Sequence, residues 1–337
     1  MKKIMFFRTL FYLGGTEIAI LNLIRELRDY DIYIGYTDET SDKQLLDRYR
    51  KYATVVKLDE KYEQKMDDLV ICEPYKHALK VNELVDRNKT ILWFHHFGER
   101  SQSIFTDDSF YNIIDKIVTV SESCKKTILK QDYGKKIKNK VDVIYNIIDS
   151  NRVIEKSKVD SDIVVDHTKQ LNLVSVGRVC YEKGFDRQLK LAQLFRDNNI
   201  DFKWYIIGGN YYKEIEQKIK EKYDEFEDNF EFTGFLDNPY NIIKQCDYLV
   251  LLSDNETWGL VITEAKILKV PCIVTDFDVA YEQIVDDETG IILSRDNMDS
   301  YADKISSIIN NKKKYKQNLN DYEWLNDTTI QRWHEIL

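Results

Sequence analysis

The chain has 337 residues, which favours two domains over one, and its 43% hydrophobic and 32% charged residues are typical of a globular protein with sizeable cores. The formal net charge of −9 disfavours nucleic acid as the main partner, and no uninterrupted apolar run reaches the roughly 20 residues that span a bilayer. The five cysteines include no CxxC pair, which indicates reduced thiols in a cytosol rather than a disulfide framework or a zinc site.

The first half of the chain alternates short apolar runs with amphipathic stretches. The start resembles a signal peptide, but Arg8 interrupts its apolar stretch and no small-residue cleavage site follows, so a buried first strand is expected. Helical spacing of Ile18, Leu21 and Ile24 predicts a helix over 17–27. The apolar runs predict strands over 3–10, 31–37, 68–73, 90–96, 116–121 and 141–148.

The alternation restarts after a polar connection at 150–170. Strands are predicted over 171–178, 201–209, 230–235, 248–253, 271–276 and 290–294, with helical patterns at 185–198 and 214–226. Alternation in both halves predicts two open, mostly parallel, doubly wound sheets. Such sheets bind ligands beyond the carboxyl ends of their strands, and two facing domains would form a cleft.

These patterns predict three segments. We expect an N-terminal Rossmann-like domain over 1–155 and a C-terminal Rossmann-like domain over 156–314. The last segment, 315–337, is predicted to be helical and to pack back on the N-terminal domain.

The stretch LFYLGGTEIAI (10–20) places Gly14 and Gly15 between a strand end and the start of a helix. A diglycine lets backbone amides approach a ligand, and a helix N-terminus favours anions. The alternative is a tight strand-to-helix turn without a ligand. The pattern is not GxGxxG, and no acidic residue follows at the distance that a ribose requires, so a dinucleotide site is disfavoured.

The stretch SVGRVCYEKGFD (175–186) places Arg178 and Lys183 just beyond a predicted strand. Both could face one anion, Arg178 through its planar fork and Lys183 as a point charge. The alternative is a pair of ordinary surface cations. Their place at the carboxyl end of a parallel strand favours the anion.

The stretch SDNETWGLVITEAK (253–266) follows a buried strand and carries two carboxylates, Glu256 in a loop and Glu264 about a turn inside the next helix. The free amides of the helix start lie between them and, with the helix dipole, could bind phosphate. The two carboxylates could then accept hydrogen bonds from hydroxyl groups on either side. The alternative is that both are solvated helix residues.

The segment Lys125–Lys140 carries seven lysines against one aspartate. Either a solvated helix and loop or a patch for anionic lipid or phosphate explains this excess.

Several motifs resemble the retaining glycosyltransferases of family four, which have the GT-B fold of two Rossmann-like domains facing a central cleft. In chain order they are GGTE, VGRVCYEKGFD, YIIGG, FTGFLDNPYNIIKQCDYLVLLS, NETWGLVITEAKILKVPCIVTD and DDETGIIL. The resemblance covers most of the chain and is most specific over 175–293. It implies transfer of a sugar from a nucleoside diphosphate donor, expected to be a UDP-sugar, with no other cofactor and no metal.

The resemblance also implies roles for individual residues. Arg178 and Lys183 match the family's cations on the donor diphosphate, and Gly15 matches the glycine of the first loop beside the distal phosphate. Glu256 matches the glutamate that contacts the donor sugar, and Glu264 the one that holds the ribose. The remaining matched positions bind the donor through the phosphate-binding segment and the base pocket: Thr257, Trp258, Gly259, Leu260 and Leu236.

A histidine near the reaction centre is also implied. In ILWFHHFGE the better match is His95, with His96 as its rival, and a structural role for either stays open. The Thr257-Trp258 pair departs from the family pattern, so the sugar pocket and the orientation of Trp258 are open. YIIGGNYYKE also departs, and Tyr211-Tyr212 either line the cleft or cap a helix.

The implied acceptor is a glycan, a lipid-linked sugar or a glycoprotein of the bacterial surface, bound near Gly15, His95 and 97–112. A cytoplasmic enzyme at the inner face of the membrane would use Lys125–Lys140 as a peripheral contact. Two other classes stay open: a GT-B nucleotide-sugar epimerase, which would turn over its donor without an acceptor, and a non-catalytic glycan-binding subunit. The second predicts decay of the donor motif, whereas Arg178, Lys183, Glu256 and Glu264 are all present.

Overall fold

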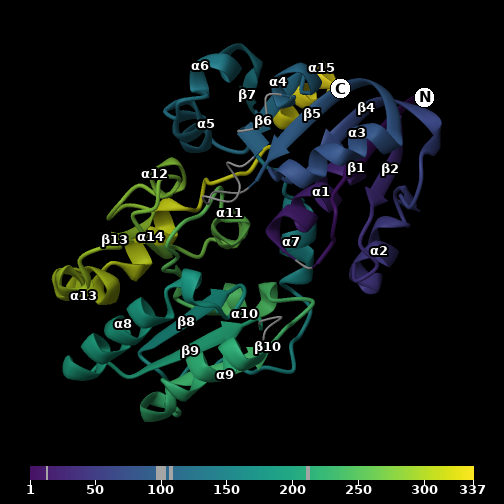
Figure 1. The fold of residues 1–337 in the computed structure, drawn as a ribbon. Helices are drawn as coiled ribbons and strands as arrows, with labels where there is room; N and C mark the ends of the chain where they lie inside the picture. The colour runs from purple at the N-terminus through teal and green to yellow at the C-terminus, as the bar shows by residue number, and fades with distance from the viewer. Residues whose placement is uncertain (13, 96–103, 106–108, 210–212) are drawn as a thin grey trace. The chain divides into compact units, whose positions relative to one another are not determined.

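The structure is a computed structural model, and it describes all residues except 13, 96–103, 106–108 and 210–212 (Figure 1). The chain divides into two compact units. Unit 1 comprises Met1–Ile148 and Leu325–Leu337, and unit 2 comprises Asp149–Trp324. Each unit has its own sheet and its own hydrophobic core, so each is described separately.

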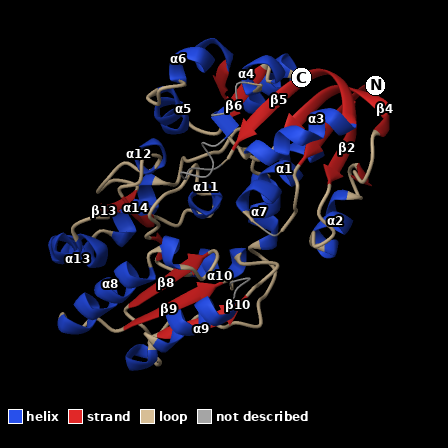
Figure 2. Ribbon diagram, in the orientation of Figure 1, coloured by secondary structure: helices blue, strands red, loops and turns tan. Residues whose placement is uncertain are grey.

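The described part of unit 1 contains one sheet of seven parallel strands in the order β3-β2-β1-β4-β5-β6-β7. Figure 2 shows strands in red and helices in blue. The order reverses between β1 and β4, which is the point where doubly wound sheets bind ligands. The strands are β1 (Lys2–Phe7), β2 (Tyr30–Tyr36), β3 (Thr54–Lys57), β4 (Tyr62–Ile71), β5 (Val85–Phe94), β6 (Lys116–Thr119) and β7 (Val141–Val143).

Burial explains why β1 forms at the centre of this sheet. Ile4, Met5 and Phe6 are successive residues that point to opposite faces, and all three are fully buried. Both faces of the sheet are therefore covered, which is the usual environment of a parallel sheet.

Helices connect the strands of unit 1. Asp42 caps one of them by accepting a hydrogen bond from Leu45 N at 3.0 Å, and Ser121 caps another by accepting from Cys124 N at 3.0 Å. The helices are α1 (Gly15–Glu26), α2 (Lys43–Tyr49), η1 (Lys76–Lys80), α3 (Val81–Leu84), α4 (Phe110–Ile113), α5 (Glu122–Leu129), α6 (Gly134–Ile137), η3 (Lys138–Lys140) and α15 (Asp327–Ile336).

The C-terminal helix α15 belongs to unit 1 although it follows unit 2 in the chain. Trp333 is fully buried and packs edge-on against Trp93 of β5, with ring centres 4.8 Å apart. Lys89 donates to the carbonyl of Ile336, and Tyr30 shares a 2.8 Å hydrogen bond with His334. Aromatic burial and these polar contacts dock α15 on the sheet of unit 1.

The described part of unit 2 contains six parallel strands in the order β10-β9-β8-β11-β12-β13. Numbered within the unit this is 3-2-1-4-5-6, the order of a Rossmann sheet, with its switch point between β8 and β11. The strands are β8 (Leu171–Val176), β9 (Phe202–Ile207), β10 (Phe230–Gly234), β11 (Tyr248–Leu251), β12 (Cys272–Thr275) and β13 (Gly290–Leu293).

The connecting helices of unit 2 complete the alternation. They are α7 (Ser150–Lys156), η4 (Tyr181–Lys183), α8 (Phe185–Asp197), α9 (Lys213–Glu221), η5 (Asp224–Phe226), α10 (Tyr240–Gln245), α11 (Leu260–Ile267), α12 (Ala280–Gln283), η6 (Met298–Ser300), α13 (Tyr301–Asn310) and α14 (Lys312–Asn318). None of the helices in the described ranges is both long and apolar enough to cross a membrane.

The two doubly wound parallel sheets confirm the predicted fold class, and each of the twelve predicted strands overlaps an observed one. The elements that were not predicted include β3 and α7. β3 is a four-residue edge strand without a buried face, and α7 lies in the connection that showed no helical period. Along the chain, the units divide after Ile148 and after Trp324. The limits expected from the sequence were 155 and 314.

Two glycines offer a test of how closely the strand ends of unit 2 approach one another. Gly184 has φ +66°, and a Cβ there would lie 1.9 Å from the carbonyl oxygen of Leu252; Gly234 has φ +73° with nothing within 4 Å of a Cβ. We expect Gly234→Ala to lower the free energy of unfolding by about 1 kcal/mol through backbone strain alone, and Gly184→Ala to lower it by several times as much. Chemical denaturation of both variants checks this, and equal losses would contradict the close approach.

Candidate functional site

The carboxyl ends of β8 and β11 lie side by side at the switch point of unit 2, because these strands are neighbours in the sheet. The segments that leave them are joined to each other. Asp254 N donates to Glu182 O at 2.8 Å, and Arg187 Nε donates to Leu252 O at 2.8 Å. Arg187 also pairs with the Asp254 carboxylate. Two segments distant in sequence are therefore fixed at one edge of the sheet.

Lys183 and Glu256 form an ion pair between these two segments. Lys183 Nζ lies 2.6 Å from Glu256 Oε1, and the same oxygen accepts a hydrogen bond from Ser253 Oγ at 2.8 Å. The side chains are 22% and 14% exposed, respectively. The pair thus presents a cation and a carboxylate in fixed positions that a ligand can still reach.

Arg178 lies on the same segment as Lys183, two residues beyond the end of β8. Its Nη2 is 3.5 Å from Glu182 Oε2, and its side chain is about half exposed. An exposed pair of this kind is worth little in water, so Arg178 can exchange Glu182 for a ligand anion at small cost.

The start of α11 supplies backbone donors next to Glu256. Gly259 is the N-cap residue, with φ +75°, a conformation that favours glycine, and α11 begins at Leu260. The first amides of a helix have no intrahelical acceptor and lie at the positive end of its dipole. An anion at this end could accept hydrogen bonds from the amides of Gly259 and Leu260, as expected from the sequence.

Glu264 lies one turn into α11 and is half-buried. Its Oε1 accepts a hydrogen bond from Tyr240 Oη at 2.9 Å. Burial raises the pKa of Glu264, while the bond from Tyr240 and the charge of Arg152 act against this rise. A carboxylate held by one hydroxyl keeps further acceptor positions, which suits a ligand with hydroxyl groups.

Trp258 packs inward, which answers the question that the sequence left open about its orientation. Its side chain is 4% exposed, and its ring lies 5.5 Å from that of Trp324. Its Nε1 donates to Thr263 Oγ1 at 3.1 Å. Only the backbone of Trp258 is therefore offered to a ligand.

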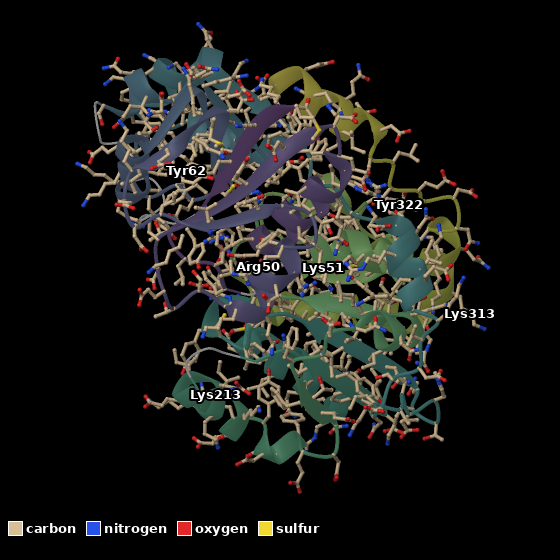
Figure 3. All side chains as sticks on the ribbon, turned by 90° about the vertical axis from the view of Figure 1, so that its right-hand side faces the viewer. Arg50, Lys51, Tyr62, Lys213, Lys313 and Tyr322 are labelled. Carbon is tan, nitrogen blue, oxygen red and sulfur yellow. The ribbon has the colours of Figure 1, made fainter. Side chains whose placement is uncertain are left out.

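Gln283 of α12 holds that backbone in place and was not predicted. Its Nε2 donates to the carbonyl of Trp258, and its Oε1 accepts from Thr263 Oγ1 at 2.8 Å. Lys266 Nζ donates to the backbone carbonyl of Gln283 and lies 4.2 Å from the ring centre of Tyr322, which is labelled in Figure 3. The loop before α11 is thus held in place by Gln283, which lies outside the recognised motif.

Leu236 and Thr257 complete the predicted donor set. Leu236 is half-buried two residues beyond β10, and Thr257 is half-buried beside Glu256. Hydrogen bonds join the carboxyl ends of β8, β9 and β10. Gly177 N donates to Ile207 O at 3.0 Å, and Gly208 N donates to Gly234 O at 2.8 Å. Leu236 therefore follows the same edge of the sheet as Lys183, two strands away.

Unit 1 has its own polar cluster where β1 and β4 end. Arg8 Nη1 lies 2.5 Å from Glu17 Oε1, and Arg8 Nε lies 3.9 Å from Glu73 Oε2. Glu73 Oε1 accepts from Thr9 N at 2.8 Å. Glu17 is in the first turn of α1, and burial raises its pKa against the opposing effect of Arg8. This cluster was not predicted, because its members follow different strands.

Gly15 and His95 are the predicted site residues of unit 1. Gly15 is the first residue of α1 and is exposed, after Gly14 in extended conformation as the N-cap. His95 follows β5, is 8% exposed and lies against Trp93, with ring centres 4.3 Å apart. His96 and the pair Tyr211-Tyr212 lie outside the described residues.

The structure brings Lys183, Glu256 and the start of α11 together in unit 2, with Arg178 on the segment that carries Lys183. Gly15 and His95 belong to unit 1. Within the described part of the chain, no group of three or more His, Cys, Asp or Glu side chains is arranged to hold a metal ion.

The buried position of His95 predicts a pH dependence of stability. Burial, and then the charge of Arg8, lower the pKa of His95 from 6.5 to about 3, so the imidazole is neutral in the native protein. As pH falls through 6.5 the unfolded chain binds a proton that the native chain does not bind, so this contribution is present above that pH and is lost below it. Between pH of about 7.5 and about 5.5 we expect a loss of about 1.4 kcal/mol from the free energy of unfolding.

Chemical denaturation at the two pH values, with His95→Asn beside the wild type, measures this contribution. The variant is expected to lose about 1.4 kcal/mol less than the wild type over the same interval. Equal losses in the two proteins would mean that His95 titrates normally.

The chain is similar to known glycosyltransferases. Residues 158–322 match the family described as glycosyl transferases group 1. The chain is 24% identical to an uncharacterized glycosyltransferase of Haemophilus influenzae over 100% of both proteins. It is 26% identical to the capsular polysaccharide biosynthesis glycosyltransferase CapM of Staphylococcus aureus, over 58% of this chain and 52% of CapM. It is also 23% identical to the O-antigen biosynthesis glycosyltransferase WclY of Escherichia coli, over 80% and 78%.

Solved structures agree on the fold. HepE of Anabaena, in complex with UDP-glucose, has a TM-score of 0.80 at 16% identity and covers 100% of this chain and 99% of HepE. TarM of S. aureus, in a complex that includes UDP, has a TM-score of 0.73 at 13% identity over 100% and 99%. Residues 158–322 thus belong to the group 1 glycosyl transferases, and with its two Rossmann-like sheets the chain has the GT-B fold.

Proposed function

We propose that the protein transfers a sugar from a UDP-sugar to a hydroxyl group of a surface glycan or its lipid-linked precursor, with retention of anomeric configuration. The observation that carries the proposal is the Lys183–Glu256 pair beside the first turn of α11, at the switch point of unit 2. It joins a cation for phosphate, a carboxylate for hydroxyl groups and free helix amides at one strand edge. UDP as the nucleotide is supported by HepE and TarM, whose solved complexes contain UDP.

In this proposal the donor lies along the edge of the unit 2 sheet. Arg178, Lys183 and the amides of Gly259 and Leu260 bind the diphosphate. Glu256 accepts hydrogen bonds from the sugar, and Glu264 accepts them from the ribose.

The remaining donor-site residues have narrower roles. The backbone of Thr257 and Trp258 lies along the phosphates, and Leu236 lines the base pocket. Gly15 of unit 1 meets the distal phosphate through its amide, since an exposed glycine at a helix start leaves room for one.

The reaction breaks the bond between the anomeric carbon and the distal phosphate oxygen, and it forms a bond from the acceptor oxygen to that carbon on the same face. The acceptor proton goes to the departing phosphate oxygen. Negative charge grows on the diphosphate as it leaves, and Arg178, Lys183 and the helix amides stabilise it; preorganised donors of this kind are usually the largest catalytic contribution. His95, neutral in the native protein, can donate or accept a hydrogen bond at the sugar but supplies no charge.

The cations after β8 give the most direct kinetic test. We expect Lys183→Ala and Arg178→Ala each to lower kcat/KM for UDP release from the donor sugar by roughly 100-fold, because each removes a charge that meets the leaving group. Steady-state UDP release, with the UDP-sugar that most raises the melting temperature, is the measurement.

Lys313→Ala is the matched control for these variants. Lys313 is an exposed lysine of α14 in the same unit, labelled in Figure 3. We expect it to behave as the wild type. Near-normal turnover by Lys183→Ala would contradict the assignment, and conversion of the donor into an isomer without release of UDP would identify an epimerase instead.

The acceptor proposal includes the membrane surface and a cytoplasmic location. CapM and WclY are named for capsule and O-antigen synthesis, and the described cysteines are all free thiols. Within Lys125–Lys140, Lys140 turns inward and donates to the carbonyls of Tyr111 and Ile114 at 2.8 and 2.7 Å. The exposed lysines form what we call the basic patch: Lys126, Lys130, Lys135, Lys136 and Lys138.

Sedimentation with vesicles tests the basic patch. We expect changing Lys126, Lys130 and Lys135 to Gln to weaken binding to anionic vesicles by about 1 kcal/mol per lysine and to leave binding to neutral vesicles unchanged. The control changes three other exposed lysines of unit 1 to Gln: Lys51, Lys61 and Lys65. Equal binding by the two triple variants would remove the patch from the proposal.

A further inference from the structure

Unit 1 contains a cavity of about 860 Å³ that belongs to none of the sites above. It lies among the segment after β4, the helices η1 and α3, the start of β5 and the start of α4. Its volume is that of a small-ligand site. The lining residues are Tyr75, Lys76, His77, Leu79, Lys80, Asn82, Glu83, Arg87, Ser109 and Ile113.

Positive charge predominates in the lining. Lys76, Lys80 and Arg87 face one acidic residue, Glu83, in a chain whose net charge is −9. Arg87 is held in place, since its Nε donates to Thr90 Oγ1 at 3.1 Å and its Nη1 to Asn82 O at 2.7 Å. Arg87 Nη1 also donates to Val85 O at 3.2 Å, so Nη2 is the nitrogen that remains for a ligand. A fixed guanidinium with exposed lysines nearby favours an anion, and Nη2 can donate to an oxygen of a carboxylate or a phosphate.

The rest of the lining suits a sugar ring. The rings of Tyr75 and His77 stack with centres 5.5 Å apart and planes 12° from parallel, and Leu79 adds an apolar surface. Asn82 and Ser109 supply an amide and a hydroxyl group. Flat aromatic surface with a few polar groups at its margin matches a sugar ring, which has apolar faces and a polar edge.

The cavity is tied to the switch point of unit 1. His77 Nε2 lies 3.8 Å from Glu73 Oε1, and that oxygen accepts the amide of Thr9, the second residue after β1. Glu73 in turn faces Arg8, which pairs with Glu17 of α1. A ligand in contact with His77 would therefore be separated only by that side chain from Glu73, a member of the polar cluster at the ends of β1 and β4.

We propose that this cavity binds the acceptor, and that the acceptor carries a negative charge there, as a phosphate on a sugar or as the carboxylate of a uronate. The assignment as acceptor rests on the proposed function, because only a transferase needs a second sugar. The sugar-binding activity of the cavity does not rest on it. Lys80 is the test position, since it is exposed, lines the cavity and lies outside the donor site.

Three probes that differ only at the sixth carbon separate charge from sugar: glucose, glucuronate and glucose 6-phosphate. Binding is followed by ligand-observed NMR in the presence of saturating UDP, which fills the phosphate site of unit 2. The variant is Lys80→Glu. Its matched control is Lys51→Glu. Lys51 is an exposed lysine of the same unit, labelled in Figure 3, and lies between α2 and the edge strand β3, away from the cavity beside β4 and β5.

We expect wild type and Lys51→Glu to bind the charged probes equally and more tightly than glucose. Lys80→Glu is expected to weaken the charged probes about tenfold, since a nearby cation becomes an anion, and to leave glucose unchanged. The preferred charged probe identifies the source of the charge as phosphate or carboxylate.

Three results would overturn the proposal: no binding of either charged probe at millimolar concentration, equal binding of glucose, or equal effects of Lys80→Glu and Lys51→Glu. UDP is titrated into separate samples of the same proteins that contain no UDP and no probe. A protein that binds UDP but neither charged probe refutes the cavity alone. A protein that binds the charged probes but not UDP refutes the proposed function and leaves an anionic-sugar site.

Discussion

The candidate site depends on how closely the segment after β8 approaches the end of β11. Gly184 lies so near the carbonyl of Leu252 that no side chain fits between them, and Arg187 binds the same carbonyl from the adjoining turn of α8. This approach sets Lys183 opposite Glu256. The fixed backbone of both segments leaves only the two side chains to be ordered when the ion pair forms, which limits its cost in conformational entropy. The Lys183–Glu256 ion pair thus depends on the neighbouring positions of β8 and β11 and on the close approach that Gly184 allows.

The two units hold their charges differently. In unit 1 the Arg8–Glu17 pair is almost fully buried, and losing one partner would strand a charge in the core. In unit 2 Lys183 and Glu256 keep part of their surface open. A buried ion pair is suited to holding a loop in place. A partly exposed pair can separate, so that each group binds a ligand instead of its partner. We therefore regard the Arg8 cluster as support for the α1 start and the Lys183 pair as the binding group.

The sequence predicted the features that repeat with a period or follow a strand end. Strand-helix alternation predicted both sheets, and the motifs placed Lys183 and Glu256 on adjoining loops, as observed. The hydrogen bond from Gln283 to Trp258 could not be predicted, because Gln283 reaches Trp258 only through the packing of α12. The same limit applies to the neutral state of His95, which depends on burial. The cavity at Lys80 matches no motif in the sequence, since its lining joins the stretch 75–87 to Ser109 and Ile113 only through the fold.

We propose that the segments after β8 and β11 of unit 2 hold a nucleoside diphosphate. A crystal structure of the complex with UDP would locate it. We expect the diphosphate within hydrogen-bond distance of Arg178, Lys183 and the amide of Leu260, with the ribose hydroxyl groups on Glu264. A diphosphate bound elsewhere would contradict this placement. So would a ribose that makes no hydrogen bond to Glu264, whose carboxylate would then accept only from Tyr240.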